Sequence, residues 1–207
     1  MPPDYAVSAF VTLLVIVDPA GLAAIFIGVT EGLSSKERRS VGVRACVIAG
    51  IILVGTALVG DPLLRHLGIG LPAFQIAGGL LLFWIAADMV YGTRTERDSR
   101  TAEEVADEHI RNIAAFPLAI PMMAGPGAIA ATVLLSGRAP NALTLAGLIA
   151  IIVAVCAITL VSFLFALPIK RALGVTGNIV LARLLGVILA ALAVQYVIDG
   201  VRTVMRV

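Results

Sequence analysis

Two short segments carry residues whose types and spacing suit the binding of a small charged solute. The first is Asp18-Pro19-Ala20-Gly21, and the second is Gly125-Pro126-Gly127-Ala128. Proline removes a backbone donor and glycine loosens a helix, so each segment predicts a break in a membrane helix. At the first break we expect Asp18 to be the N-cap and Pro19 the first residue of a new half-helix. The second new half-helix is expected to start near Gly127.

Breaks of this kind free backbone groups for binding. The N–H groups and the positive dipole end at a half-helix N-terminus favour a carboxylate, and carbonyl groups freed before the break favour an ammonium group. The two segments together therefore predict a substrate site for a small zwitterion near the middle of the membrane. The alternative is that both are plain kinks whose backbone groups are satisfied by neighbouring helices.

Asp18 is the clearest acid within an apolar stretch of the chain. A carboxylate at membrane depth is costly unless it is paired, capped or protonated, so such a residue is a functional candidate. We therefore predict that Asp18 couples transport to protons. Its alternative role is the helix cap itself, and the two roles are compatible. Gly125 occupies the corresponding place in the second segment, so only one half carries the charge.

Gln75 and Arg183 are two further candidate substrate-binding residues at membrane depth. Arg183 is expected about one turn inside the last apolar segment, where it could hold a substrate carboxylate, pair with an acid or extend to the membrane interface. Gln75 could bind substrate or hydrogen-bond a neighbouring helix.

The sequence offers no pattern for catalysis, for a metal or for a cofactor. Cys46 and Cys156 lie within apolar runs and do not form a CxxC pair, while His66 and His109 fall in predicted loops. No nucleotide-binding GxxxxGK[ST] sequence is present. We therefore expect a protein that is not an enzyme and does not hydrolyse ATP.

The elements that position these residues are apolar helices. Of the residues, 60% are hydrophobic and only 14% are charged, against roughly 25% in soluble domains. The mean hydropathy is +1.05. Six segments approach the roughly 20 residues that span a bilayer. They are Tyr5–Val29, Val43–Gly60, Ile69–Tyr91, Ile113–Leu135, Leu143–Leu167 and Ile179–Val201.

The basic residues predict the orientation, because Lys and Arg favour cytoplasmic loops. The loops after segments one, three and five carry ten of them, and the other face carries four. Both termini are therefore expected outside the cell. No dense basic cluster suits nucleic acid. The glycine-rich second and third segments would permit association into a homo-oligomer.

The two halves of the chain resemble each other. Pro126 follows Pro19 by 107 residues (126 − 19), and Gly186 follows Gly78 by 108 (186 − 78). Three helices per half put the second unit into the membrane the opposite way round, as in many secondary transporters. The predicted fold is thus an all-α integral membrane protein with six helices in a 3+3 inverted repeat. Its parts are residues 1–92, a polar cytoplasmic loop at 93–112, and residues 113–207.

Three stretches resemble the MarC family of bacterial six-span membrane proteins, also called the neutral amino-acid transporter family. The first is Val17 to Thr30, with its Asp-Pro-Ala-Gly sequence. The second, and the most specific, is Pro117-Leu118-Ala119-Ile120-Pro121 through Ala124-Gly125-Pro126-Gly127-Ala128-Ile129. The third is Arg183-Leu184-Leu185-Gly186 through Gln195 and Gly200. One departure is that segment one lacks a second proline after Pro19.

The resemblance implies a protein of the bacterial plasma (inner) membrane, akin to the LysE-type exporters. Its implied substrates are small neutral amino acids such as glycine, alanine, serine and threonine. We therefore expect a proton-linked secondary transporter with membrane lipid as its surroundings. Three alternatives remain open at this point: an exporter of another small metabolite or drug, a membrane enzyme or thiol-transfer protein, and a channel or scaffold.

Overall fold

The computed structural model describes residues 1–92 and 114–205 of the chain, and every element in these ranges is helical. The predicted loop at 93–112 therefore lies outside the described residues. The elements are α1 (Pro3–Val17), α2 (Pro19–Val29), α3 (Ser35–His66), α4 (Leu71–Tyr91), η1 (Ala114–Met123), α6 (Pro126–Gly137), α7 (Ala142–Leu164) and α8 (Ala166–Met205).

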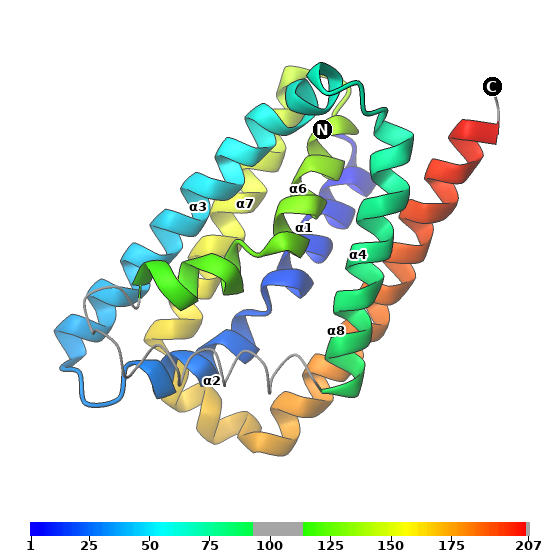
Figure 1. The fold of residues 1–207 in the computed structure, drawn as a ribbon. Coiled ribbons are helices and arrows are strands. Elements are labelled where there is room, and N and C mark those ends of the chain that lie inside the picture. Colours follow the sequence, from blue (N-terminus) through cyan, green and yellow to red (C-terminus); the bar gives the residue numbers. More distant parts are fainter. Residues whose placement is uncertain (93–113, 206–207) are drawn as a thin grey trace.

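The helices run back and forth along one direction, and α1 begins at the same end of the bundle at which α8 ends (Figure 1). Five candidate membrane spans are long and apolar enough to cross a bilayer, with α1 and α2 together counting as one. The bent pair of η1 and α6 brings the number to six. The expectation of an all-α, multi-span membrane protein is confirmed.

Two long helix pairs flank a central helix. α4 packs along α8, and α3 packs along α7, while α6 contacts α1, α3 and α4. Glycines allow the first pair to approach closely. A Cβ on Gly79 would lie 2.8 Å from the carbonyl oxygen of Ala193, and one on Gly186 would lie 3.1 Å from the carbonyl oxygen of Ala86. These glycines of α4 and α8 therefore serve contacts within the chain.

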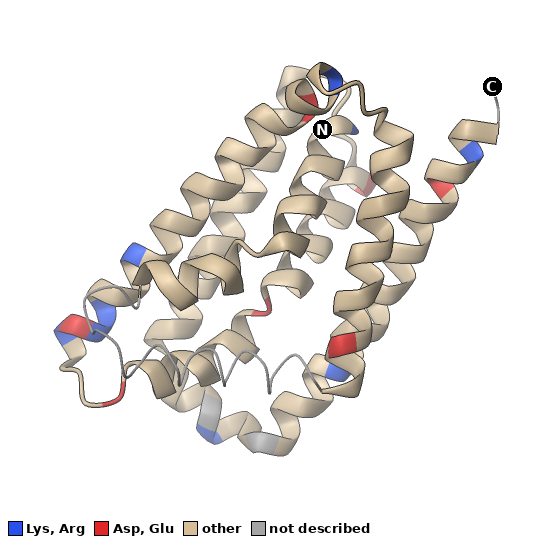
Figure 2. Ribbon diagram, viewed as in Figure 1, with Lys and Arg blue, Asp and Glu red and all other residues tan. Residues whose placement is uncertain are grey.

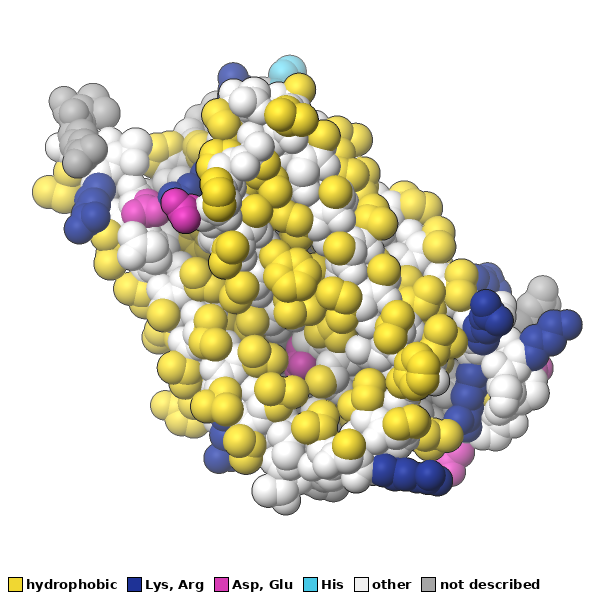
Figure 3. All heavy atoms as spheres, turned by 180° about the vertical axis from the view of Figure 1, so that it is seen from behind, with side chains coloured by type: hydrophobic (Ala, Val, Ile, Leu, Met, Phe, Trp, Pro, Cys, Tyr) yellow, Lys and Arg dark blue, Asp and Glu magenta, His cyan; other side chains and the backbone are white. Residues whose placement is uncertain are grey.

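The outer surface of the bundle is apolar. Viewed from behind, yellow hydrophobic side chains cover most of the face, and a single acidic group is visible in a hollow near its centre (Figure 3). The exposed large hydrophobic side chains include Val47, Ile51, Leu58, Leu80, Phe83, Trp84, Val153, Leu184 and Val187. A surface of this kind requires lipid as its solvent.

Charged residues gather at the two ends of the bundle, with one exception (Figure 2). That exception is the acidic residue at the junction of α1 and α2, which is Asp18. One end carries the basic residues at the start of α3, including Arg38 and Arg39, and the opposite end carries Arg65 and Arg138. The bundle is therefore apolar along its length except at the first helix break.

Helices α3 and α8 are longer than the second and sixth apolar segments of the sequence, which predict them. α3 starts at Ser35, because Ser34 and Glu37 form a capping box that fixes the start of the helix eight residues before Val43. α8 starts at Ala166 and is interrupted at Gly174, whose φ of 61° favours glycine. Hydropathy does not detect the polar start of α3. At α8 the apolar residues Ala166 and Leu167 continue the fifth apolar run in the sequence, whereas in the structure α7 ends at Leu164 and α8 begins at Ala166.

Candidate functional site

The first helix break lies at a single residue, Asp18. Its backbone is left-handed, with φ 51° and ψ 68°, so Asp18 ends α1 and caps α2 at the same time. Its Oδ1 accepts a hydrogen bond of 3.1 Å from the amide of Gly21. Pro19 is the first residue of α2. The predicted cap and the predicted helix start are both confirmed, and aspartate is one of the few residue types that adopts this backbone routinely.

The Asp18 carboxylate lies over the first turn of α2 because residue 21 is glycine. A Cβ added to Gly21 would collide with Oδ2 of Asp18. By contrast, a Cβ on Gly28, near the other end of the same helix, would meet nothing within 4 Å. The cap therefore depends on two residue types together, an acid and a glycine three positions later.

The second break is longer and begins with irregular backbone. Phe116 and Ile120 are extended, with φ −137° and −126°, and each precedes a proline. The residue before a proline is disfavoured in helical conformation, which explains both positions. The segment then bends by 55° into α6. The fourth apolar segment is therefore broken, as predicted, but its first part is not a regular half-helix.

The N-terminus of α6 is formed by Gly125 as N-cap and Pro126 as the first helical residue, one position before the expected start at Gly127. No side chain caps this end. A Cβ on Gly125 would collide with the carbonyl oxygen of Pro121, so only glycine fits the close approach of the backbone here. The amide groups of this first turn are therefore held close to the backbone that precedes the break.

A cavity of about 360 Å³ lies at this second N-terminus. Its lining residues are Ile16, Leu81, Trp84, Ile85, Pro121, Met122, Gly125, Pro126, Gly127 and Ala128. The volume falls within the roughly 300–1,000 Å³ typical of small-molecule sites. The side chains in the walls come from α1, α4 and η1 and are apolar apart from the indole N–H of Trp84, and the residues of the break, Gly125 to Ala128, contribute no polar side chain.

The two breaks lie next to each other in the structure. Ile16, two residues before Asp18, lines the cavity together with Gly127. A Cβ on Gly127 would lie 3.6 Å from Cγ2 of Ile16 and would collide with Cδ1 of Ile85. Four of the ten predicted substrate-binding residues, Gly125 to Ala128, therefore line the cavity. The four at the first break, Asp18 to Gly21, follow shortly after Ile16 but do not line it.

The remaining two predicted residues lie elsewhere. Gln75 is buried in the second turn of α4, and its Cβ is 3.2 Å from the position of a Cβ on Gly200. It precedes Ile85 in the cavity by ten positions (85 − 75), or roughly 15 Å of helix. Arg183 is exposed on α8, one turn before Gly186. Neither residue lines the cavity.

The groups at the two breaks suit the binding of a charged solute. No group of three His, Cys, Asp or Glu side chains in the described part of the chain is placed to hold a metal ion. Cys46 and Cys156 are both buried and free. What the two N-termini offer is amide groups, a helix dipole and one carboxylate, which suit a ligand with both charges.

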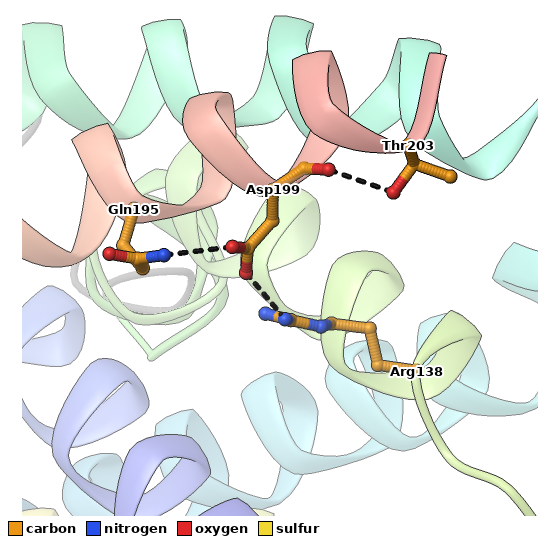
Figure 4. Close-up of polar contacts among 4 residues, drawn as sticks. All are labelled: Arg138, Gln195, Asp199 and Thr203. Carbon is orange, nitrogen blue, oxygen red and sulfur yellow. Dashed lines mark hydrogen bonds and ion pairs between the residues drawn. The ribbon is translucent and has the colours of Figure 1, made fainter. Parts of the chain in front are cut away.

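A polar cluster that the sequence analysis missed lies at the end of the bundle where α1 begins. Arg138, just after α6, forms an ion pair of 2.6 Å with Asp199 of α8 (Figure 4). Gln195 donates a hydrogen bond of 2.8 Å to the same carboxylate. A contact between residues 61 positions apart gives no local signal, so the pair could not be found by helix spacing.

Comparison with known proteins shows which family the chain is similar to. Residues 4–205 match the family described as MarC family integral membrane protein. A UPF0056 membrane protein of Archaeoglobus fulgidus is 39% identical, covering 93% of this chain and 90% of its own length. One of Aquifex aeolicus is 37% identical (97% and 94%), and YhcE of Escherichia coli is 33% identical (93% and 90%). No solved structure matches the chain.

Proposed function

Because the chain belongs to the MarC family of integral membrane proteins, we propose that it is a secondary transporter of small neutral amino acids. The substrates are of the glycine, alanine, serine and threonine class. Transport is linked to protons and proceeds by alternating access to one site. The membrane is the bacterial inner membrane, with both termini outside.

One observation carries this proposal: a cavity of about 360 Å³ lies at the N-terminus of α6, and Ile16, two residues before the break at Asp18, also lines it. In this proposal the substrate carboxylate binds the amide groups at the start of α6, near Gly127 and Ala128. The ammonium group binds nearer to Asp18 and to carbonyl groups that precede the breaks. The small cavity and the apolar walls at Ile85 and Met122 favour short, uncharged side chains.

An inverted repeat is part of the proposal. In it α3 corresponds to α7, α4 to α8, and the broken pair α1–α2 to η1–α6. The packing supports this correspondence, because corresponding helices pack on each other in the pairs α3–α7 and α4–α8. The contacts of α3 with α6 and η1 also have counterparts in those of α7 with α1 and α2. Rocking of one repeat against the other would then expose the site alternately to the two sides.

The sidedness rests on charge. The basic residues at the start of α3 and Arg171 of α8 lie toward the end opposite to the termini, where Lys and Arg are expected to face the cytoplasm. Both termini are then outside.

Asp18 is the proposed proton carrier. Its carboxylate is partly buried in the interior of the bundle, and it already serves as the cap of α2. Protonation would weaken the hydrogen bond to Gly21, because a charged acceptor binds an amide more strongly than a neutral one. Protonation of Asp18 would thus alter the N-terminus of α2, which in this proposal lies near the substrate.

The test is counterflow in proteoliposomes. Purified protein is reconstituted with unlabelled alanine inside, and uptake of labelled alanine is measured against protein-free liposomes. The proposal predicts uptake that glycine, serine and threonine reduce and that lysine and glutamate do not. An imposed pH gradient is expected to drive net uptake. Absence of exchange for every neutral amino acid would overturn the assigned substrate class.

A second candidate is an exporter of a more apolar metabolite. The observation that favours it is the cavity wall, to which Trp84 and Leu81 contribute although both are largely exposed on the outer face. A cavity that reaches this face could admit a solute from the bilayer. Competition of alanine counterflow by apolar amino acids, with no effect of serine, would favour this alternative.

A further inference from the structure

The ion pair between Arg138 and Asp199 joins α6 to α8 at the end of the bundle where α1 begins (Figure 4). Both oxygens of the carboxylate are engaged, one by Arg138 at 2.6 Å and the other by Gln195 at 2.8 Å. The Arg138 and Asp199 side chains nonetheless remain 36% and 25% exposed. A solute arriving from this end can therefore reach both charges.

A buried tyrosine beside this pair has an unsatisfied hydroxyl group. Tyr196 is 2% exposed, and its hydroxyl has no hydrogen-bond partner within the described residues. The guanidinium carbon of Arg138 lies 5.3 Å from the centroid of the Tyr196 ring. Buried polar groups are nearly always satisfied, so an orphaned hydroxyl indicates a place where a ligand, a water molecule or another arrangement supplies the partner.

Four helices, α1, α4, α6 and α8, meet at this end. Tyr5 of α1 donates a hydrogen bond of 2.7 Å to the carbonyl of Leu135 in α6. A Cβ on Gly137 would lie 2.5 Å from Leu71 of α4, so these two helices are also in close contact. Arg138 follows Gly127 at the cavity by eleven positions (138 − 127), or roughly 16 Å of helix. Separation of α6 from α8 at this end would therefore break the ion pair between Arg138 and Asp199.

We propose that Arg138 and Asp199 form a gate that a zwitterionic solute opens by exchange, a proposal that rests on the transport function above. The carboxylate of the solute replaces Asp199 on Arg138, and its ammonium group replaces Arg138 on Asp199. The Tyr196 ring offers the ammonium group an additional cation–π partner. Every charge keeps a partner while α6 and α8 separate.

The exchange also gives selectivity. A solute with one charge can replace only one member of the pair and leaves the other without a partner, which is costly in a partly buried place. Zwitterions therefore open the gate, and simple anions or cations do not. The gate and the cavity would thus select for the same class of solute at two places along one path.

The test measures access past the gate directly. Cys46 and Cys156 are replaced by alanine, and Ala131→Cys provides a reporter that is fully buried, seven residues before Arg138 and hence on the same face of α6. Reaction with a water-soluble maleimide is followed in lipid nanodiscs. Ala49→Cys, which is equally buried in α3, reports any loosening of the whole bundle.

Gate variants are expected to raise the labelling rate of the Ala131→Cys reporter at least tenfold. The variants are Arg138→Gln and Asp199→Asn, and the exchanged pair, Arg138→Asp with Asp199→Arg, is expected to restore slow labelling. Arg65→Gln is the matched control, because Arg65 pairs at 2.9 Å with Asp61 of its own helix and joins no two elements. Alanine is expected to accelerate labelling of the intact gate, whereas acetate and methylammonium are not.

Three outcomes would overturn the proposal. Unchanged labelling in both single variants would show that the pair does not control access. Equal acceleration of the Ala49→Cys reporter would show general loosening and not a gate. Acceleration by acetate or methylammonium equal to that by alanine would show that exchange with a zwitterion is not what opens it. Alanine counterflow on the same preparations separates the gate proposal from the proposed transport function. If the labelling results are as expected but alanine counterflow is absent, only the transport function is refuted.

Discussion

At the scale of single residues, the structure explains why an acid stands in the middle of an apolar segment. Asp18 ends one helix, starts the next and adopts a backbone that most residues avoid. Local chemistry predicted this role from the sequence, since an acid before Pro19 and Gly21 is a recognisable helix start. The pairing of Arg138 with Asp199 was not predictable, because no local pattern connects residues so far apart.

Replacement of Asp18 by asparagine separates its two roles. The Asp18→Asn side chain can still accept the hydrogen bond from Gly21 and tolerates left-handed backbone, so folding is expected to be retained. Proton coupling requires a group that titrates. We expect alanine counterflow to persist, with a higher half-saturating alanine concentration because the ammonium group loses a charged partner, and uptake driven by a pH gradient to fall at least tenfold. Retention of full pH-driven uptake at normal expression would remove Asp18 from the coupling mechanism.

Alanine substitutions at two glycines of α2, Gly21 and Gly28, form a matched pair that tests the Asp18 cap. Gly21→Ala displaces the Asp18 carboxylate, so the variant should lose a cap that is typically worth about 1 kcal/mol. Gly28→Ala meets nothing and should be neutral or stabilising by up to about 1 kcal/mol, because alanine favours a helix. Thermal unfolding in detergent measures both. Equal midpoints for the two variants would contradict the dependence of the cap on Gly21.

At the scale of elements, hydropathy located the apolar part of each helix but not its ends. The start of α3 depends on the capping box of Ser34 and Glu37, which lies in a polar stretch. The irregular backbone of η1 depends on two prolines that act on the residues before them, Phe116 and Ile120. The break at Gly125 was predictable because a proline and two glycines occur together within an apolar run.

The close packing of α4 on α8 predicts a strong effect of one added methyl group. Gly79→Ala would place a Cβ 2.8 Å from the Ala193 carbonyl oxygen, and backbone cannot move aside as a side chain can. Overpacking of this kind typically costs 1–3 kcal/mol, so we expect a loss of about that size in unfolding free energy. Gly55→Ala in α3 is the control, since its Cβ would meet nothing within 4 Å. Titration with sodium dodecyl sulfate, followed by circular dichroism, compares the two. A midpoint for Gly79→Ala at or above that of Gly55→Ala would contradict the packing argument.

At the scale of the whole molecule, composition alone required a lipid-embedded bundle, and the apolar surface and the family match agree with it. The repeat was suggested by offsets between a few residues such as Pro19 and Pro126, and the inverted arrangement remains a proposal. Composition could not predict that the two breaks lie close together, because their positions depend on how α1, α4 and α6 pack around Gly127.

The distribution of charge predicts the orientation of the whole bundle. We expect alkaline phosphatase fused after the C-terminus to be active in cells, because that end should lie outside the inner membrane. The same enzyme inserted at the polar segment 93–112 should be inactive, since that segment is predicted to be cytoplasmic. Green fluorescent protein at the two positions should give the opposite pattern. A fluorescent C-terminal fusion would contradict the assigned sidedness.

The central claim is that a small neutral amino acid binds where the two helix breaks meet. The most direct measurement is alanine counterflow by three proteins at equal reconstitution: the unaltered chain, Gly127→Val and Gly55→Val. The first substitution fills the cavity against Ile85 and Ile16, and the second adds the same side chain where it meets open space. We predict exchange by the unaltered chain and by Gly55→Val, and none above protein-free liposomes by Gly127→Val. Undiminished exchange by a folded Gly127→Val protein, or no exchange by any of the three, would contradict the account.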